Sequence, residues 1–181
     1  MIRNRRWIAA IAVASVALGL LSAVPATHAA EDPGQVVDRF QAAYRAGSVQ
    51  GMLALYAADA TFEDVNQRHH FKGTEQLQAL LSGIVAVHLS MDLEETRRVV
   101  DGNTVVVEYA YRGQLNGAVL GASVGKEGCP NLTYNLPATS WFKVEKGRIV
   151  HQKDFIDWAT FLDLRNEMLA AGTDVGGGAG S

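Results

Sequence analysis

Hydrophobic positions along this chain recur first at helical spacing and later at every second residue. Between Asp32 and Gly47, apolar side chains fall three and four residues apart, after an Asp-Pro pair typical of a helix start and before a glycine typical of a helix end. Ser48 is expected to cap a second short helix. A third helix is predicted from Thr74, as its cap, to Val85, with a buried stripe of Leu77, Leu80, Leu81 and Ile84.

Alternation of apolar and polar residues then predicts four long strands in a row. They are Val87 to Val100, Thr104 to Gln114, Leu132 to Val144, and Ile149 to Trp158. Tight turns join the first pair and the last pair, because each connection carries the glycine that a hairpin turn favours. A last helix is expected from Ala159 to Ala170. Four antiparallel strands need one face covered, and the three N-terminal helices can cover it, so the fold class is α+β.

The stretch from Leu55 to Val65, LYAADATFEDV, connects the second helix to a short strand. We expect a turn through Ala57, Ala58 and Asp59 and then a strand that places Phe62 and Asp64 on one face. A carboxylate that faces an apolar interior must be paired, hydrogen-bonded or used in chemistry. Asp64 is therefore a candidate functional residue.

The N-terminus has the pattern of a secretory signal peptide over residues 1–29. Arginines 3, 5 and 6 precede an apolar segment from Trp7 to Val24, and Thr27-His28-Ala29 is typical of a cleavage site. The alternative is an uncleaved membrane anchor, since 18 apolar residues are near the lower limit for a spanning helix. We expect a secreted protein or one of the periplasmic or cell-wall space, with one domain at 30–171 and a disordered Gly-rich tail at 172–181.

The mature charge excludes two classes of partner. Without the signal peptide, 13 basic residues face 19 acidic ones, a net charge of −6. A chain of this kind has no basic surface for nucleic acid and no polybasic patch for a membrane, so a small hydrophobic molecule is the expected partner. No cofactor and no metal site are expected, because His69 and His70 lack a third ligand at a recognised spacing.

Two features stay open at this point. Cys129 is the only cysteine, which excludes an internal disulfide and leaves either an inert loop thiol or a cross-link between two chains. The Gly-rich insertion from Leu115 to Asn131 predicts either a lid over a pocket or a mobile hairpin tip.

The order helix, helix, short strand, helix and four long strands resembles the cone-shaped nuclear transport factor 2-like superfamily. That superfamily includes ketosteroid isomerases, SnoaL-like polyketide cyclases and limonene epoxide hydrolases. LYAADATFED is similar to the segment in which ketosteroid isomerases present their catalytic base, which falls on Asp64. The stretch 147–157, GRIVHQKDFID, resembles the last strand of limonene epoxide hydrolases, whose water-activating aspartate falls on Asp154.

The resemblance also shows departures from both activities. The oxyanion-hole tyrosine of ketosteroid isomerases falls on Phe40, and their protonated aspartate falls on Thr139. In the comparison with epoxide hydrolases, the Arg-x-Asp motif falls on Tyr109-Ala110-Tyr111 and the Tyr-x-Asn motif on Phe62-Glu63-Asp64. The chemistry of either parent enzyme would thus need different partner groups here.

The candidate site combines alternation with this resemblance. Asp154 and Asp64 are predicted as an acid/base pair, with Tyr109 or Tyr111 donating to a substrate oxygen. The expected substrate-binding residues are Phe40, Phe62, Asn135, Thr139, Trp141 and Gln152. The predicted reaction is epoxide hydration or proton transfer next to a carbonyl. The alternatives are that both carboxylates are structural, and that the protein is a non-catalytic binding module or pairs through its sheet as a homodimer.

Overall fold

The computed structural model describes residues 32–175. The predicted signal peptide at 1–29 lies outside this range and stays a prediction. Within the described residues, no helix is long and apolar enough to cross a membrane.

Three helices form the inner layer of the molecule. Helix α1 (Pro33–Arg45) begins at Asp32, whose side chain accepts a hydrogen bond from Gly34 N. The predicted Ser48 cap of helix α2 (Val49–Leu53) is also confirmed. Helix α3 (Gly73–Val87) differs from the prediction, because Thr74 does not cap it and instead donates to the carbonyl oxygen of Ala58. The chain enters α3 from an extended strand, so a backbone carbonyl is the partner within reach of that hydroxyl.

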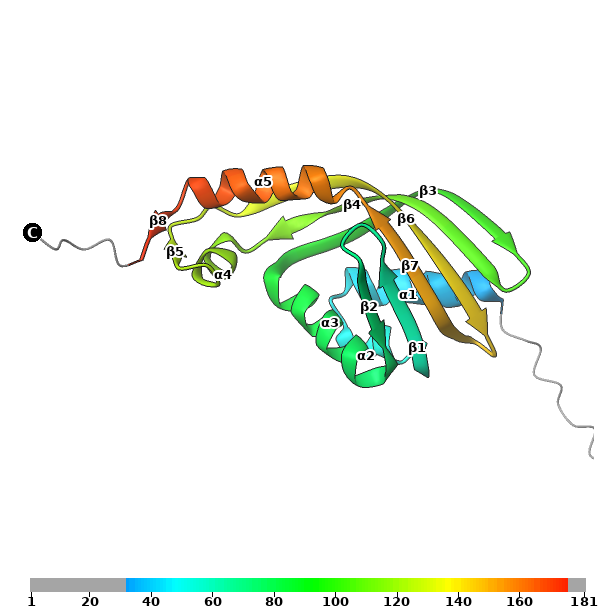
Figure 1. Ribbon diagram of the computed structural model, residues 1–181. Helices are drawn as coiled ribbons and strands as arrows, with labels where there is room; N and C mark the ends of the chain where they lie inside the picture. The colour runs from blue at the N-terminus through cyan, green and yellow to red at the C-terminus, as the bar shows by residue number, and fades with distance from the viewer. Residues whose placement is uncertain (1–31, 176–181) are drawn as a thin grey trace, which may run out of the picture.

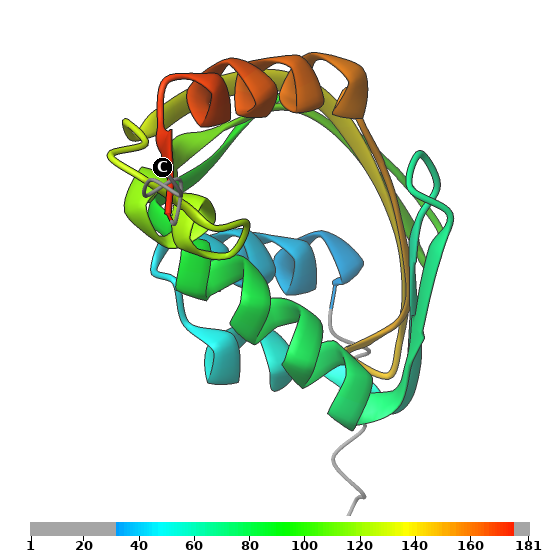
Figure 2. The same cartoon turned by 60° about the vertical axis from the view of Figure 1, so that its left-hand side comes forward.

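A curved sheet wraps around these helices, as the turned view in Figure 2 shows. Its order is β2-β1-β7-β6-β4-β3, and β1 and β7 run parallel while the other neighbours are antiparallel. The strands of the main sheet are β1 (Tyr56–Asp64), β2 (His69–Lys72), β3 (His88–Asp101), β4 (Thr104–Leu115), β6 (Leu132–Glu145) and β7 (Arg148–Ile156). The predicted α+β cone with helices on its concave face is confirmed (Figure 1).

Strand β1 is longer than its sequence indicated. The predicted turn at Ala57 to Asp59 is wrong, because these residues lie within β1. Their place is an irregularity in the pairing with β7, between Tyr56 and Thr61. An irregular step of this kind bends a strand without ending it, so the stretch Ala57 to Asp59, which suggested a turn, instead marks a bend.

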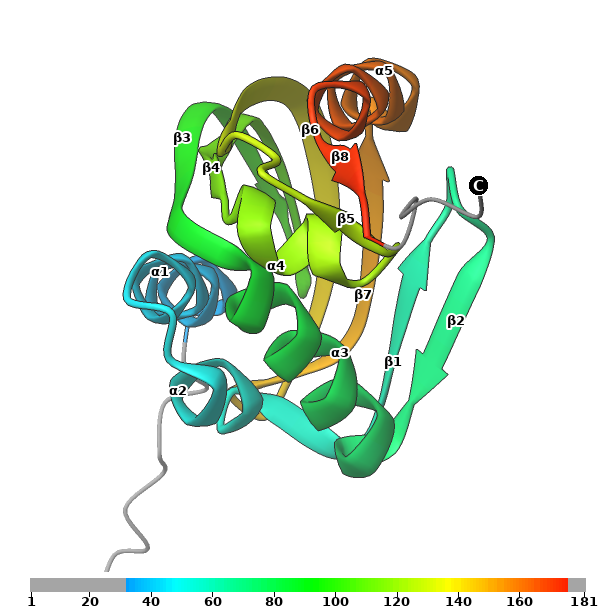
Figure 3. The ribbon, with the colours of Figure 1, turned by 90° about the vertical axis from the view of Figure 1, so that its left-hand side faces the viewer.

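The Gly-rich insertion is a folded part of the domain. It forms helix α4 (Gly117–Ala122), which Asn116 caps, and strand β5 (Lys126–Glu127). Strand β5 pairs with β8 (Thr173–Asp174), so residues 172–175 of the predicted disordered tail instead belong to the fold. Figure 3 shows this small sheet beside α4 and below helix α5 (Trp158–Ala170). Cys129 lies buried in this region.

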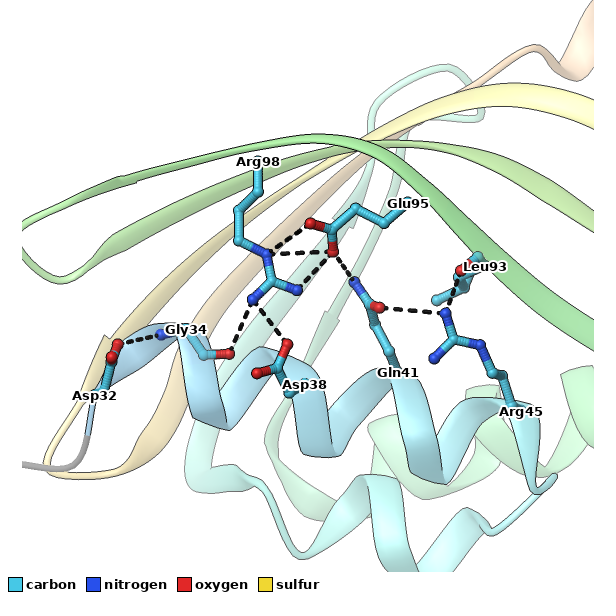
Figure 4. Close-up of polar contacts among 8 residues, drawn as sticks. All are labelled: Asp32, Gly34, Asp38, Gln41, Arg45, Leu93, Glu95 and Arg98. Atoms are coloured by element: carbon cyan, nitrogen blue, oxygen red, sulfur yellow. Dashed lines mark hydrogen bonds and ion pairs between the residues drawn. The ribbon is translucent and has the colours of Figure 1, made fainter.

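A polar network joins helix α1 to strand β3 (Figure 4). Arg98 binds Asp38 at 2.8 Å and Glu95 at 2.5 Å, and Gln41 donates to Glu95 at 3.1 Å. A shift in the β3–β4 register between Glu95 and Arg97 changes the phase of β3 at this point. Because of that shift, Glu95 and Arg98, which lie three residues apart, both turn toward α1.

Candidate functional site

A cavity of about 430 Å³ lies between the helices and the concave face of the sheet. Its walls are mostly apolar and come from α1, α3, β3, β4 and α5, and Leu120 of the insertion adds to them. A small number of polar groups reach it, among them Asp64, Asp154, Gln152 and Tyr111. Apolar walls with a few convergent polar groups are typical of small-molecule sites.

The two predicted carboxylates do lie together. Asp64 on β1 and Asp154 on β7 are register partners in neighbouring parallel strands, whose chains run about 4.8 Å apart. Both side chains line the cavity, and the residues are only 8 % and 7 % exposed. Gln152 and Asp154 therefore both face the cavity, as expected.

A chain of buried hydrogen bonds holds the Asp154 carboxylate. Its Oδ1 accepts from the Ser140 hydroxyl and from Gln152 Nε2 at 2.9 Å, and its Oδ2 lies 3.1 Å from the same nitrogen. The Tyr109 hydroxyl bonds Ser140 in turn, and the Tyr56 hydroxyl donates to Gln152 Oε1. Asp154 is fixed at the cavity wall with Oδ2 as its less engaged oxygen.

Burial is the main cause of an unusual acidity at this site. It raises the pKa of Asp154 from 3.8 to about 6, and the charge of Asp64 adds to the rise. The hydrogen bonds from Ser140 and Gln152 act in the opposite direction, because they stabilise the charged form. A carboxyl with this pKa can take up and release a proton close to neutral pH.

Asp64 has different partners. Its carboxylate accepts from Trp158 Nε1 at 2.8 and 3.1 Å and from the backbone N–H of Gln67 at 3.1 Å. The first contact fastens the start of α5, and the second closes the β1–β2 turn. Asp64 therefore faces the cavity, as expected for a functional residue. It also makes the hydrogen bonds expected if this carboxylate were purely structural.

The tyrosines of β4 both face inward, as predicted. Tyr109 is buried beside Ser140, and Tyr111 accepts a hydrogen bond from the Tyr44 hydroxyl at 2.6 Å. Burial raises the pKa of both Tyr109 and Tyr111, so both keep their protons at neutral pH. Phe40 and Phe62 also line the cavity, as expected.

Three predicted binding residues lie on the wrong face. Asn135, Thr139 and Trp141 point to the outer side of β6, and Trp141 is 48 % exposed. The residues between them, such as Ser140, face the inner side of β6 instead. The reason is the pairing of β6 with β7, in which Ser140 lies opposite the inward-facing Asp154. A shift of one residue moves every side chain of a strand to the other face. Charged Lys143 and Glu145 share the phase of Trp141 and could have revealed the error.

Sequence reasoning also missed several residues of the site. Ser140 and Tyr56 belong to the chain of hydrogen bonds around Asp154, and Trp158 holds Asp64. His88 lines the cavity, and its Nδ1 lies 2.5 Å from the carbonyl oxygen of Ile84. Among residues 32–175, no group of three His, Cys, Asp or Glu side chains is arranged to hold a metal ion.

Comparison with known proteins agrees with this architecture. The model of the SnoaL-like domain matches residues 37–152. A protein assigned as a SnoaL-like polyketide cyclase from Shewanella denitrificans is 21% identical, with a TM-score of 0.65 over 75% of this chain and 97% of that one. A protein assigned as a polyketide cyclase from Xanthomonas campestris is 22% identical, with a TM-score of 0.62 over 74% and 96%.

A third similar structure has a ketosteroid isomerase-like fold. It is a hypothetical protein from Catenulispora acidiphila, 19% identical, with a TM-score of 0.60 over 73% of this chain and 92% of that one. At these identities the structures support the fold alone, whereas the family model covers more than half of the chain. The helical inner layer, the curved sheet and the match over residues 37–152 together place this chain in the SnoaL-like domain family.

Proposed function

We propose that this SnoaL-like protein binds a small hydrophobic oxygenated molecule in its cavity and catalyses a proton transfer with Asp154 as the base. The observation that carries the proposal is a buried carboxyl on the wall of an apolar cavity, with a pKa raised to about 6. Such a group is mostly ionised at neutral pH, yet it lies in surroundings that favour its protonated form. It can therefore accept a proton from an acidic carbon or from water.

Tyr111 is the proton donor that the hydrogen bonds leave free for a substrate. Tyr44 donates to Tyr111, so the hydrogen of the Tyr111 hydroxyl can point to another acceptor. The hydrogen of Tyr109 is engaged, because Ser140 donates its own hydrogen to Asp154 and can only accept from Tyr109. Tyr109 thus positions Asp154 through Ser140.

The acidity of Tyr111 favours one of the two predicted reactions. Epoxide opening needs a group that gives up its proton to the departing oxygen, and burial makes Tyr111 a weak acid. Proton transfer next to a carbonyl needs only a hydrogen bond to the enolate oxygen. In that reaction Asp154 takes the proton from the α-carbon, the C–H electron pair moves into the enolate, and Asp154 returns the proton to carbon.

Two probes separate these reactions. Exchange of the α-protons of 2-tetralone in D₂O, followed by NMR, reports proton abstraction, and hydrolysis of styrene oxide reports epoxide hydration. We expect exchange with 2-tetralone, and Asp154→Asn should slow it by about 100-fold or more. Thr139→Val, on the outer face of β6, is the matched control and should keep the wild-type rate. Exchange that survives in Asp154→Asn would refute the role of Asp154.

A binding module without catalysis is the second candidate. It is favoured by the bonds of Asp64 to Trp158 and Gln67, which give that carboxylate a structural role. On this alternative, 2-tetralone would bind, as seen by protein-observed NMR shifts of cavity residues, and neither probe would react. The same experiment therefore distinguishes an enzyme from a binder.

Pairing of two chains through the outer face of the sheet is proposed separately. Trp141 and Phe155 are 48 % and 37 % exposed there, and an open hollow of about 510 Å³ lies beside Phe155, Pro137 and Thr139. Exposed aromatic residues on a sheet face are typical of an interface. Sedimentation velocity should show a dimer that Trp141→Lys converts to a monomer. A monomeric wild-type protein would contradict this pairing.

A further inference from the structure

Arg165 stands where α5 faces the cavity. Trp158, Phe161 and Arg165 are spaced three and four residues apart, so they lie on one side of the helix. All three line the cavity. The orientation of this side is fixed, because Trp158 donates to Asp64 and packs edge-on against Phe161 at 4.8 Å between ring centroids. Arg165 is thereby held at the cavity wall.

The guanidinium group of Arg165 has no protein anion as a partner. Its helix neighbours three and four residues away are apolar: Phe161, Leu162, Met168 and Leu169. Among residues 32–175 it makes no hydrogen bond or ion pair, although Arg45, Arg98 and Arg112 all bind carboxylates. The cavity carboxylates are held by other donors, Asp64 by Trp158 and Gln67, and Asp154 by Ser140 and Gln152.

A half-buried cation without a counter-ion is unfavourable unless a ligand supplies one. Arg165 is partly withdrawn from solvent, and apolar side chains such as Leu120 and Val87 line the same cavity. A guanidinium presents donors in a planar fork, which matches a carboxylate with two parallel hydrogen bonds. The other lining residues provide the apolar surface for the rest of such a ligand.

We propose that Arg165 is the anion-binding residue of this cavity and that the natural ligand is an aromatic or fused-ring molecule bearing a carboxylate. This inference rests on the proposed function of the cavity and names the substrate class. Arg165 lies seven residues after Trp158, or about 10 Å along the helix axis. The carboxylate binds at that position while the ring system extends toward Asp64 and Asp154.

Two probes of the same shape test the charge requirement. Anthracene-2-carboxylate and anthracene-2-carboxamide differ in charge but have nearly the same volume, and their fluorescence reports binding at pH 7.5. We expect the wild-type protein to bind the carboxylate at least tenfold more tightly than the carboxamide, as a charged hydrogen-bonded pair requires. Arg165→Gln should remove this preference and change carboxamide binding by less than about twofold.

Two further variants serve as references. Arg165→Lys keeps the charge and loses the planar fork, so an intermediate preference is expected. Arg97→Gln makes the same change of charge at an exposed position of β3, away from the cavity, and should behave as wild type. Melting temperatures within about 2 °C of wild type would show that the variants are folded.

The outcomes distinguish the two levels of the proposal. Equal binding of the two probes by the wild type, or an unchanged preference in Arg165→Gln, would overturn the anion site and leave the proposed function of the cavity intact. Failure of both probes to bind would overturn the anion site together with the cavity as a site for aromatic ligands. A preference lost equally in Arg97→Gln would mean that general charge attraction, and not Arg165, selects the carboxylate.

Discussion

Replacing Asp154 by Asn should remove one contribution to the pH dependence of the free energy of unfolding. Burial raises the pKa of Asp154 from 3.8 to about 6. The folded state thus holds this proton more tightly than the unfolded state does. The resulting stabilisation is present in full below about pH 3.8 and is lost as the pH rises through about 6. Asparagine at this position does not titrate.

The size of the effect follows from the two pKa values. A rise from 3.8 to about 6 corresponds to about 3 kcal/mol in the free energy of unfolding. Of this, about 2 kcal/mol is lost between pH 4.5 and pH 7.5, because the carboxyl is already partly ionised in the unfolded chain at pH 4.5. The stability of Asp154→Asn relative to wild type should therefore improve by about 2 kcal/mol over that range.

Urea unfolding of both proteins at pH 4.5 and pH 7.5 measures this difference, with tryptophan fluorescence as the probe. Asp163→Asn is the matched control, since Asp163 is exposed on α5. Its stability relative to wild type should change by less than about 0.5 kcal/mol between the two pH values. A difference between Asp154→Asn and wild type that stays constant with pH would refute the conclusion that burial perturbs this carboxyl.

Four further changes test the site and the packing of the fold around it. Ser140→Ala removes a hydrogen bond that stabilises the charged carboxylate of Asp154, so the pKa of Asp154 should rise further. Carboxyl ¹³C NMR measures this pKa, and an unchanged or lower value would contradict a role for the Ser140 hydrogen bond. Asp64→Asn keeps the shape of the side chain but makes it a weaker acceptor for the Trp158 N–H. Urea unfolding should show a free energy of unfolding lower by about 1–2 kcal/mol. An unchanged free energy of unfolding would mean that this hydrogen bond does not hold α5 in place. Gly83→Ala should stabilise α3 by about 0.5–1 kcal/mol, since nothing lies within 4 Å of the added methyl group. Gly113→Ala should destabilise the protein by about 1–3 kcal/mol, because the added methyl group would lie 2.4 Å from the carbonyl oxygen of Ser90. Similar changes in melting temperature for Gly83→Ala and Gly113→Ala would refute the close contact at Gly113.

The sequence alone determined the order of the main helices and long strands, the layer architecture and one inner face. Asp32 and Ser48 cap their helices as predicted, because a cap depends on residues adjacent in the chain. Alternation also put Asp64 on the face of Phe62, and Asp154 on the face of Gln152, and the resemblance to the superfamily made the face of Asp154 the interior. Local rules were sufficient wherever the decisive partners were close in the sequence.

The tertiary structure alone decided the phase of β6 and the partners of each carboxylate. The register of β6 against β7 puts Ser140 next to Asp154 and turns Thr139 outward. The bond from Trp158 to Asp64 joins residues 94 positions apart. The pairing register and the long-range hydrogen bonds depend on how strands and helices pack against each other in space. The neighbours of a residue along the chain do not determine that packing. For this reason the sequence could name Asp154, while only the fold shows what sets its acidity.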